Sequence, residues 1–330
     1  MAQRGIHGLQ RRWYRVTPLH LLLLPLSLLF YLIAATRRLF FRRGILSSVR
    51  LPVPVIIVGN ITVGGTGKTP LTLWLAGQLL ADGWHPGIIS RGFGGSASKP
   101  QQVLDSSDPA SVGDEPVLMA QRMLCPVWVS RDRPAAAQAL LTAHPECDVI
   151  ISDDGLQHYR LQRDAEIVVV DGIRRFGNSF LLPAGPLREA TTRLREVDAV
   201  VINGGKAEHG EYSMQLEGVH FYNLLNPEIT AVAADFHGQC VHALAGIGHP
   251  ERFFNHLKKL GISQVQTHAF PDHHAYTGAD LAYDDANALL MTEKDAVKCI
   301  TFADERCWVL RVDAKLDSAL TQLILKKITH

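Results

Sequence analysis

The chain has 330 residues, of which 47% are hydrophobic and 20% are charged, and its formal net charge is +1. This composition predicts a globular protein with a sizeable core and excludes a largely disordered chain, and the length allows two domains. Five cysteines without C-x-x-C spacing favour free thiols in a reducing compartment over a disulfide framework or a structural zinc site.

The first fifty residues are apolar and basic, with nine arginines and no acidic residue. Within them, the run Leu19–Ala35 is close to the lower limit of ~17 residues for a membrane-spanning helix. A signal peptide fits poorly, because arginines and no small-residue cleavage site follow the run. Since arginines on both sides favour anionic headgroups, we expect residues 1–45 to form a membrane-associated helix with basic flanks. A spanning helix and an interfacial helix both remain open, and a buried core helix is the alternative. The arginines are Arg4, Arg11, Arg12, Arg15, Arg37, Arg38, Arg42, Arg43 and Arg50.

A glycine-rich loop follows the next apolar segment. The run Pro52–Val58 predicts a strand, and Leu71–Leu80 predicts a helix. Between them, glycines leave backbone N–H groups free to converge on phosphate oxygens, and Lys68 and Thr69 suit terminal phosphates and Mg²⁺. The strict pattern G-x-x-x-x-G-K-[ST] would place glycine where Thr62 stands, and an ordinary glycine-rich turn is the alternative. We therefore predict an ATP or GTP site at Thr62, Val63, Gly64, Gly65, Thr66, Gly67, Lys68 and Thr69.

Further apolar strands alternate with helical stretches along the chain. This alternation predicts an α/β fold: a P-loop NTPase-like parallel sheet with helices on both faces, which binds ligands at the carboxyl ends of its strands. Beyond Gly205 the sequence is more polar before a second strand–helix pattern begins. We expect a P-loop core at residues 46–210 and a smaller C-terminal α/β domain at residues 211–330 that contributes to the substrate cleft. The candidate strands are Pro86–Ser90, Pro126–Ser130, Cys147–Ser152, Ala165–Val170, Ala199–Asn203, Cys240–Ile247, Gln264–His268, Ala288–Thr292 and Trp308–Val312.

Acidic residues at the ends of predicted elements are candidates for chemistry. Asp153 and Asp154 directly follow the strand Cys147–Ser152. Carboxylates in this position hold Mg²⁺ in phosphate-loop proteins, although solvated turn residues are the alternative. Asp114 begins a predicted helix, where it either caps the helix or accepts a proton from an attacking hydroxyl. The local sequence leaves both roles open.

Histidines and basic residues near the predicted strand ends allow several interpretations. His268, Asp272, His273 and His274 could bind zinc, could be solvated, or could supply a histidine–carboxylate pair that tunes a general base. Arg188 could bind an anionic group, although a surface ion pair at the start of a helix is favoured by the local sequence. The segment Thr292–Lys298 could cap a helix or contact a phosphate.

Taken together, these segments resemble the tetraacyldisaccharide 4'-kinase family of lipid A assembly. The resemblance runs nearly from end to end, and it rests on the order and spacing of the motifs. Departures from the family pattern are mild: Phe93 stands where tyrosine is common, Gly95 where a basic residue is usual, and Leu156 where methionine is frequent. Besides the apolar N-terminal helix and the loop at residues 58–70, the motifs are SRGFGG (90–95), VGDEP (112–116), DDGLQH (153–158), PAGPLRE (183–189), GIGHPERFF (246–254), FPDHH (270–274) and TEKDAVK (292–298).

The resemblance implies an enzyme that uses ATP and Mg²⁺ to phosphorylate the 4'-hydroxyl of a tetraacylated glucosamine disaccharide 1-phosphate. It implies that Lys68 and Thr69 hold the phosphates and the metal, and that Asp153 and Asp154 belong to the metal shell. It makes Asp114 the candidate base, working with His273. Three further residues, Arg91, Arg188 and Glu189, are implied to line the substrate site.

The acyl chains of such a substrate stay in the bilayer. We therefore expect a monomer at the anionic surface of the inner membrane, with its catalytic body on the cytoplasmic side and with no nucleic-acid partner. The main rival is a membrane-bound nucleotide switch of the partition ATPase type, but Val63 stands where those proteins carry a signature lysine. A soluble small-molecule kinase with a buried N-terminal helix is the second rival.

Overall fold

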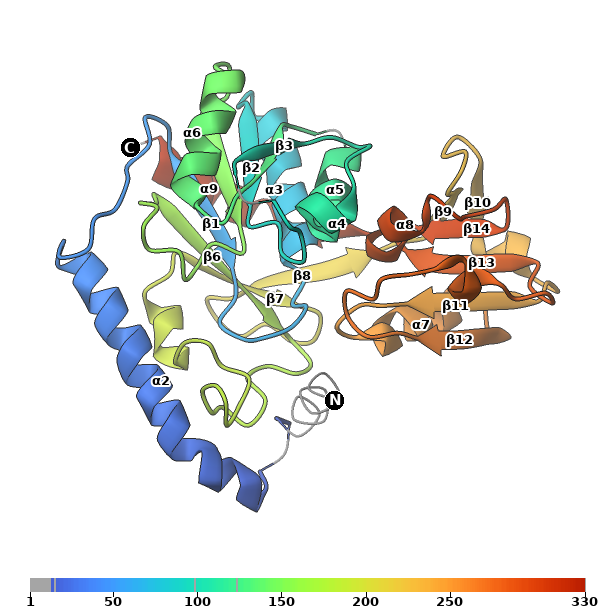
Figure 1. Cartoon of the computed structure of the whole chain (residues 1–330), viewed down its shortest axis with the longest axis horizontal. Helices are drawn as coiled ribbons and strands as arrows, with labels where there is room; N and C mark the ends of the chain where they lie inside the picture. Colours follow the sequence, from blue (N-terminus) through green and yellow to red (C-terminus); the bar gives the residue numbers. More distant parts are fainter. Residues whose placement is uncertain (1–12, 15, 98, 123, 330) are drawn as a thin grey trace.

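The computed structural model of the chain describes residues 13–14, 16–97, 99–122 and 124–329, which form two units, each with its own sheet. Figure 1 shows the larger unit on the left and the smaller unit on the right. Of the basic N-terminal flank, Arg4, Arg11, Arg12 and Arg15 lie outside the described residues. The large sheet has nine strands in the order β15-β8-β7-β6-β1-β5-β2-β4-β3. They are β1 (Val55–Gly59), β2 (Pro86–Ser90), β3 (Gln101–Val103), β4 (Val127–Val129), β5 (Val149–Asp153), β6 (Ala165–Asp171), β7 (Ala199–Asn203), β8 (Tyr212–Glu217) and β15 (Asp313–Leu316).

Helices cover both faces of the large sheet, as predicted. Alternate residues of β1 face opposite ways because strand side chains alternate with a period of two. Ile56 and Val58 pack in the core with α3 (Lys68–Ala81) and α9 (Ala319–Ile328), whereas Val55 and Ile57 pack in the core with α6 (Arg133–Ala143). All strand pairs from β8 to β4 are parallel, and only the pairs that β15 and β3 make are antiparallel. The shorter helices are α4 (Pro109–Val112), α5 (Asp114–Gln121) and the 3-10 helix η1 (Thr191–Arg195).

The small sheet has six strands in the order β10-β9-β14-β13-β11-β12. Its strands β11 to β14 confirm the four strands predicted beyond residue 240. Its elements are β9 (His220–Asn223), β10 (Thr230–Val232), η2 (Ala233–Phe236), β11 (Val241–Ala245), α7 (Pro250–Lys259), β12 (Val265–Ala269), η3 (Gly278–Leu281), β13 (Ala288–Thr292), α8 (Glu293–Cys299) and β14 (Cys307–Leu310).

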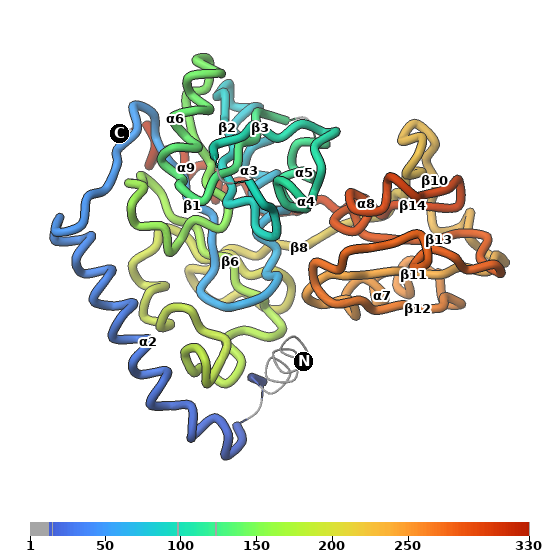
Figure 2. Tube along the Cα trace, viewed as in Figure 1, coloured from blue at the N-terminus to red at the C-terminus, as the bar shows by residue number. Residues whose placement is uncertain are grey.

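The boundary between the units differs from the expected one at residues 210 and 211. Strand β8 pairs with β7 of the large sheet, and β15 returns to pair with β8. Helix α9 then buries Leu320 and Ile324 in the core of the large unit. The small sheet therefore spans residues 220–310, and the chain crosses between the units twice (Figure 2). The alternating pattern of β8 could not show which sheet it would join.

The apolar N-terminal run forms α2 (Pro18–Arg42), which lies along the outer edge of the large unit in Figure 1. Only His20 and Ser27 of this helix are buried, so the interpretation as a buried core helix is wrong. The Ser27 hydroxyl holds the helix in place by donating to Leu181 O at 2.9 Å and accepting from Ala184 N at 3.0 Å. Among the described residues, α2 is the one helix long and apolar enough to cross a membrane, with a mean hydropathy of 2.1 over its best 18-residue window.

Candidate functional site

The glycine-rich loop connects β1 to α3, which confirms the predicted strand–loop–helix order. Gly64 and Gly67 have φ values of 110° and 97°, in the left-handed region that favours glycine. Asn203 at the end of β7 donates to Thr66 O at 2.9 Å, and a Cβ on Gly67 would lie 2.3 Å from the Asn203 Nδ2 atom. These contacts fix the conformation of the loop. Its backbone N–H groups continue into the N-terminus of α3, and helix N-termini bind anions favourably.

The segment 183–189 pairs with this loop instead of starting a helix. Thr62 and Leu187 form an antiparallel bridge, and Arg188 N donates to Ile61 O at 2.7 Å. The expected helix start at Arg188 is therefore wrong, because the backbone there is engaged with the phosphate loop. The pairing places the Arg188 guanidinium 3.4 Å from Asp154 Oδ1.

Glu189 faces a different set of partners. Its carboxylate accepts hydrogen bonds from Gln157 Nε2 at 2.8 Å and from Tyr159 Oη at 2.7 Å. Arg193 lies 3.5 Å from the same carboxylate. These contacts fix the segment after Arg188, so the side chain of Glu189 is engaged within the protein.

Asp153 and Asp154, at the end of β5, lie in contrasting environments. Asp153 is fully buried; its Oδ1 accepts from Thr72 Oγ1 at 3.1 Å, and its Oδ2 has no hydrogen-bond partner among the described residues. Burial is the main cause that raises the pKa of Asp153 to about 7. Burial would also raise the pKa of Asp154, but the charges of Lys68, 3.5 Å away, and Arg188 outweigh it and lower this pKa.

Sequence reasoning missed Arg133, which binds the backbone of Asp153 and Asp154. Its side chain is 2% exposed and donates to Asp153 O at 2.8 Å and to Asp154 O at 3.2 Å. Asp154 has a φ of 48°, so the turn after β5 is in a backbone conformation that few non-glycine residues adopt. The arginine holds both carbonyls of this turn. No local sequence pattern indicates its partners, because they lie twenty and more residues further along the chain.

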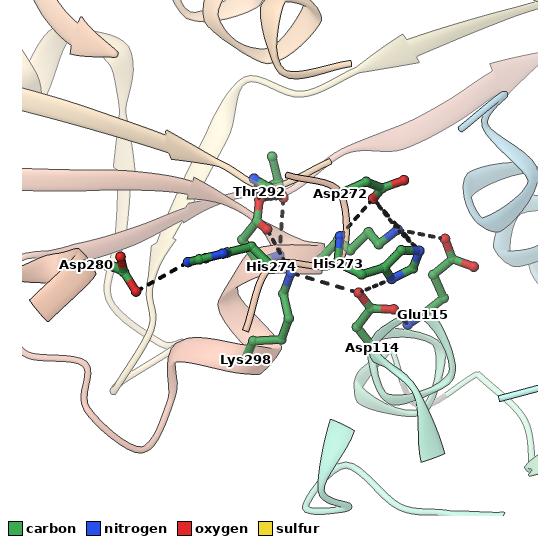
Figure 3. Close-up of polar contacts among 11 residues, drawn as sticks. Asp114, Glu115, Asp272, His273, His274, Asp280, Thr292 and Lys298 are labelled. Carbon is green, nitrogen blue, oxygen red and sulfur yellow. Dashed lines mark hydrogen bonds and ion pairs between the residues drawn. The ribbon is translucent and has the colours of Figure 1, made fainter. Parts of the chain in front are cut away.

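Asp114 and His273 come from different units and meet at hydrogen-bond distance. The distance between Asp114 Oδ2 and His273 Nδ1 is 2.9 Å, and Asp114 is 5% exposed (Figure 3). Gly113 is the N-cap of α5, so the interpretation of Asp114 as a capping residue is wrong. The His273 ring packs against Phe93, with ring centroids 5.1 Å apart.

The two pKa values of this pair move apart. Burial would raise the pKa of Asp114, but the hydrogen bond from His273 and the charge of Lys294 lower it below its usual value. Burial would lower the pKa of His273, but the hydrogen bond to Asp114 outweighs it and raises this pKa above 6.5. The pair thus favours a carboxylate beside an imidazolium, as expected for two groups that share a proton site.

Two lysines of α8, both from the segment Thr292–Lys298 that the sequence offered as a helix cap or a phosphate contact, lie beside the pair. Lys294 Nζ lies 3.0 Å from Glu115 Oε1 and 3.2 Å from Asp272 Oδ1, and these carboxylates raise its pKa although burial opposes them. Lys298 Nζ lies 3.9 Å from Asp114 Oδ2 (Figure 3). The segment Thr292–Lys298 therefore both caps α8, through Thr292, and brings positive charge to the site.

The zinc interpretation of the histidine cluster is not supported. His274 Nε2 lies 3.3 Å from Asp280 Oδ2, and His268 Nε2 lies 3.0 Å from His242 Nδ1, so neither joins His273. Arg91 is exposed at the carboxyl end of β2, and no described residue forms an ion pair or a hydrogen bond with its side chain.

The small unit approaches the phosphate loop through the segment 246–254. A Cβ on Gly248 would lie 3.2 Å from Gly65 N, so backbone meets backbone at this point. Arg252 of α7 donates to Asn203 Oδ1 at 3.2 Å and lies 3.5 Å from Asp171 Oδ2. The phosphate loop and the Asp114–His273 pair therefore both lie at the junction of the two units.

Comparisons with known proteins place the chain among related sequences. The sequence profile of the tetraacyldisaccharide-1-P 4'-kinase (LpxK) family matches residues 19–329. A tetraacyldisaccharide 4'-kinase of Methylobacillus flagellatus is 53% identical over 330 residues, covering 100% of this chain and 98% of the relative. One of Azoarcus sp. is 52% identical over 324 residues, covering 96% and 94%.

A solved structure shares the fold over almost the whole chain. It is LpxK from Aquifex aeolicus, described as a complex with ATP, and it superposes with a TM-score of 0.77 at 31% sequence identity. The match covers 94% of this chain and 99% of that one. The chain belongs to the tetraacyldisaccharide-1-P 4'-kinase family.

Proposed function

We propose that the site at the junction of the two units transfers the γ-phosphoryl group of ATP to the 4'-hydroxyl of a tetraacyldisaccharide 1-phosphate, in lipid A biosynthesis. The family assignment supports the reaction. The observation that carries the choice of site is the 2.9 Å contact between Asp114 and His273 beside the phosphate loop. In this proposal the phosphate loop binds the nucleotide, and the Asp114–His273 pair activates the acceptor hydroxyl.

In this proposal the loop Thr62–Thr69 binds the phosphates of ATP. Its backbone N–H groups and the N-terminus of α3 favour negative charge. Lys68 is 12% exposed and already lies near a carboxylate, so it is positioned to exchange Asp154 for a terminal phosphate oxygen. Arg188 and Arg91 supply further positive charge at the same edge of the sheet. Phosphoryl transfer depends mainly on such positioning and charge neutralisation.

The Asp114–His273 pair accepts the proton of the 4'-hydroxyl. With His273 neutral, the pair takes up this proton and becomes a carboxylate–imidazolium pair, which the raised pKa of His273 favours. The hydroxyl oxygen forms a bond to the γ-phosphorus, the bond from that phosphorus to the bridging oxygen breaks, and ADP leaves. Lys294 and Lys298 offset part of the negative charge of the surrounding carboxylates while a further negative charge is transferred.

The residues at the end of β5 fit Mg²⁺. The buried Asp153 Oδ2 atom has no hydrogen-bond partner among the described residues, and its burial alone would be costly for a carboxylate. Thr69, Asp153 and Asp154 together supply the oxygen donors that Mg²⁺ prefers. When bound there, the ion would neutralise negative charge on the phosphates of ATP.

We propose that the protein acts as a monomer on the cytoplasmic side of the inner membrane, where ATP is present. The exposed apolar side chains of α2 would contact the bilayer, and the exposed arginines Arg42 and Arg43 at its end would contact anionic headgroups. The lipid acceptor would then reach the site without leaving the membrane surface.

The direct test incubates the purified full-length chain with labelled ATP, Mg²⁺ and tetraacyldisaccharide 1-phosphate in mixed micelles. Formation of a labelled bisphosphorylated lipid is expected. Asp105→Asn, at an exposed acidic residue outside the site, serves as the matched control for changes at Asp114. If the folded protein formed no labelled lipid, the proposed activity would be refuted.

A further inference from the structure

The small sheet carries a second cluster of polar side chains, at the end of β11 opposite the candidate active site. Cys240 precedes β11 and His242 lies in it, so their side chains share one face of the strand. Asp285 lies on the connection between η3 and β13. A sulfur, an imidazole nitrogen and a carboxylate oxygen from these three residues lie within 4.8 Å of one another.

The spacing of these donor atoms suits a single metal ion. Cys240 Sγ lies 3.5 Å from Asp285 Oδ2 and 3.9 Å from His242 Nε2. His242 Nε2 lies 3.3 Å from Asp285 Oδ1. In a tetrahedral zinc site, with Zn–S of about 2.3 Å and Zn–N or Zn–O of about 2.0 Å, donor atoms lie about 3.3–3.6 Å apart. Small side-chain movements would therefore bring all three donors to one ion.

The surroundings of His242 are those of a metal-bound histidine. The residue is 2% exposed, and its Nδ1 atom lies 3.0 Å from His268 Nε2. A histidine that binds a metal through one ring nitrogen usually donates from the other to an outer partner, which fixes its orientation. The side chain of Asp285 is 61% exposed, so an ion can enter from solvent and a water molecule can complete its coordination.

We propose that Cys240, His242 and Asp285 bind a divalent zinc ion that stabilises the small unit. Sulfur, imidazole and carboxylate donors together favour zinc over Mg²⁺, which prefers oxygen ligands alone. The ion would tie the connection between η3 and β13 to the start of β11. The ion would lie at the amino-terminal end of β11, whereas the phosphate loop meets Gly248 beyond the carboxyl end of this strand, so the ion takes no part in phosphoryl transfer.

The test uses the full-length protein after treatment with a chelator, titrated with Co²⁺ and then with Zn²⁺ in the absence of ATP. We expect one Co²⁺ per chain with a thiolate-to-cobalt charge-transfer band, which Zn²⁺ displaces. Cys240→Ser should remove the band, and His268→Ala should weaken zinc binding by about 10–100-fold. Asp285→Asn should weaken zinc binding, whereas Asp284→Asn, at the exposed neighbouring residue, should not.

Three measurements distinguish this zinc site from the proposed Mg²⁺ site and from a loss of folding. Asp153→Asn, which alters the proposed Mg²⁺ site, should leave the band unchanged. Cys240→Ser should keep its kinase activity with Mg²⁺, which shows that the variant is folded. A band that persists in Cys240→Ser, or no stoichiometric binding by the unmodified chain, would overturn the zinc proposal. Loss of kinase activity in every variant and in the unmodified chain would instead count against the proposed function.

Discussion

Replacing Asp114 by asparagine tests the proposed base without changing the shape of the side chain. The carboxylate is 5% exposed and lies 2.9 Å from His273 Nδ1, so the substitution removes one charge from a buried pair. General base catalysis typically contributes about 10²–10⁴-fold in rate. We expect kcat to fall by about this factor, while the Kd of ATP stays close to that of the unmodified chain, because the loop proposed to bind ATP is untouched.

The pH dependence gives a second, independent measurement. In the proposed mechanism turnover requires neutral His273, so the rate should rise with pH through its pKa, which the hydrogen bond to Asp114 raises above 6.5. Without the carboxylate, burial and Lys294 lower this pKa. The acidic limb of the pH–rate profile should therefore move to lower pH in Asp114→Asn, even though the maximum rate is smaller.

The free energy of unfolding should also depend on the ionisation of Asp114 and His273. Through the pKa of His273 it should fall as the pH rises, whereas the rate rises. Because the folded-state pKa of His273 is raised, its stabilising contribution is fully present below about 6.5 and is lost as the pH rises through the folded value. The pKa of Asp114 is lowered, so its contribution is present above about 3.9 and is lost as the pH falls through the folded value. Asp114→Asn should therefore destabilise the fold most between these limits.

The assay combines steady-state kinetics on the lipid acceptor, ATP binding by calorimetry, and NMR titration of the His273 ring. Asp105→Asn should leave all three measurements unchanged. The proposed role of the Asp114–His273 pair is refuted if Asp114→Asn keeps most of its turnover, or if the acidic limb of its pH–rate profile stays in place. Equal loss of turnover and ATP binding would also remove the role of Asp114 as a base.

Three further predictions concern other parts of the molecule. Gly67→Ala should weaken ATP binding and lower the stability measured by thermal unfolding by about 1–3 kcal/mol, because φ is 97° and the added Cβ would lie 2.3 Å from Asn203 Nδ2. The control Gly77→Ala in α3, where a Cβ meets nothing within 4 Å, should instead stabilise the fold by about 0.5–1 kcal/mol. Lys68→Ala should weaken ATP binding and raise the pKa of Asp154, since Lys68 is the main group that lowers it; an unchanged Kd for ATP would contradict the assignment of the loop. Leu22→Glu, at a residue 76% exposed on α2, should reduce sedimentation with anionic vesicles while changing the free energy of unfolding by less than about 0.5 kcal/mol; undiminished sedimentation would exclude this face as the membrane contact.

The local elements follow closely from the sequence. The strand Pro86–Ser90 has the predicted bounds, and the glycine-rich loop lies between β1 and α3 as expected. Such segments are encoded by nearby residues: apolar runs that fit a buried strand, and glycines that allow positive φ. The same local information pointed to Asp153 and Asp154 at the end of β5. Motif order along the chain was enough to indicate the family.

Contacts between distant segments depended on the tertiary structure. Lys294, 179 residues after Glu115, reaches it across the junction of the two units, and no local pattern indicates such a pair. The pairing of Arg188 with the phosphate loop likewise replaced a predicted helix start, because a backbone partner outweighed local preference.

The glycine-rich loop, the apolar N-terminal segment and the α/β class were determined by the sequence itself, since short-range sterics and hydrophobic periodicity encode them. The tertiary structure decided that β8, β15 and α9 complete the large sheet and its core. It also decided that Asp114 and His273 form one pair, because hydrogen bonds and ion pairs act over a few ångströms of space and are independent of separation along the chain.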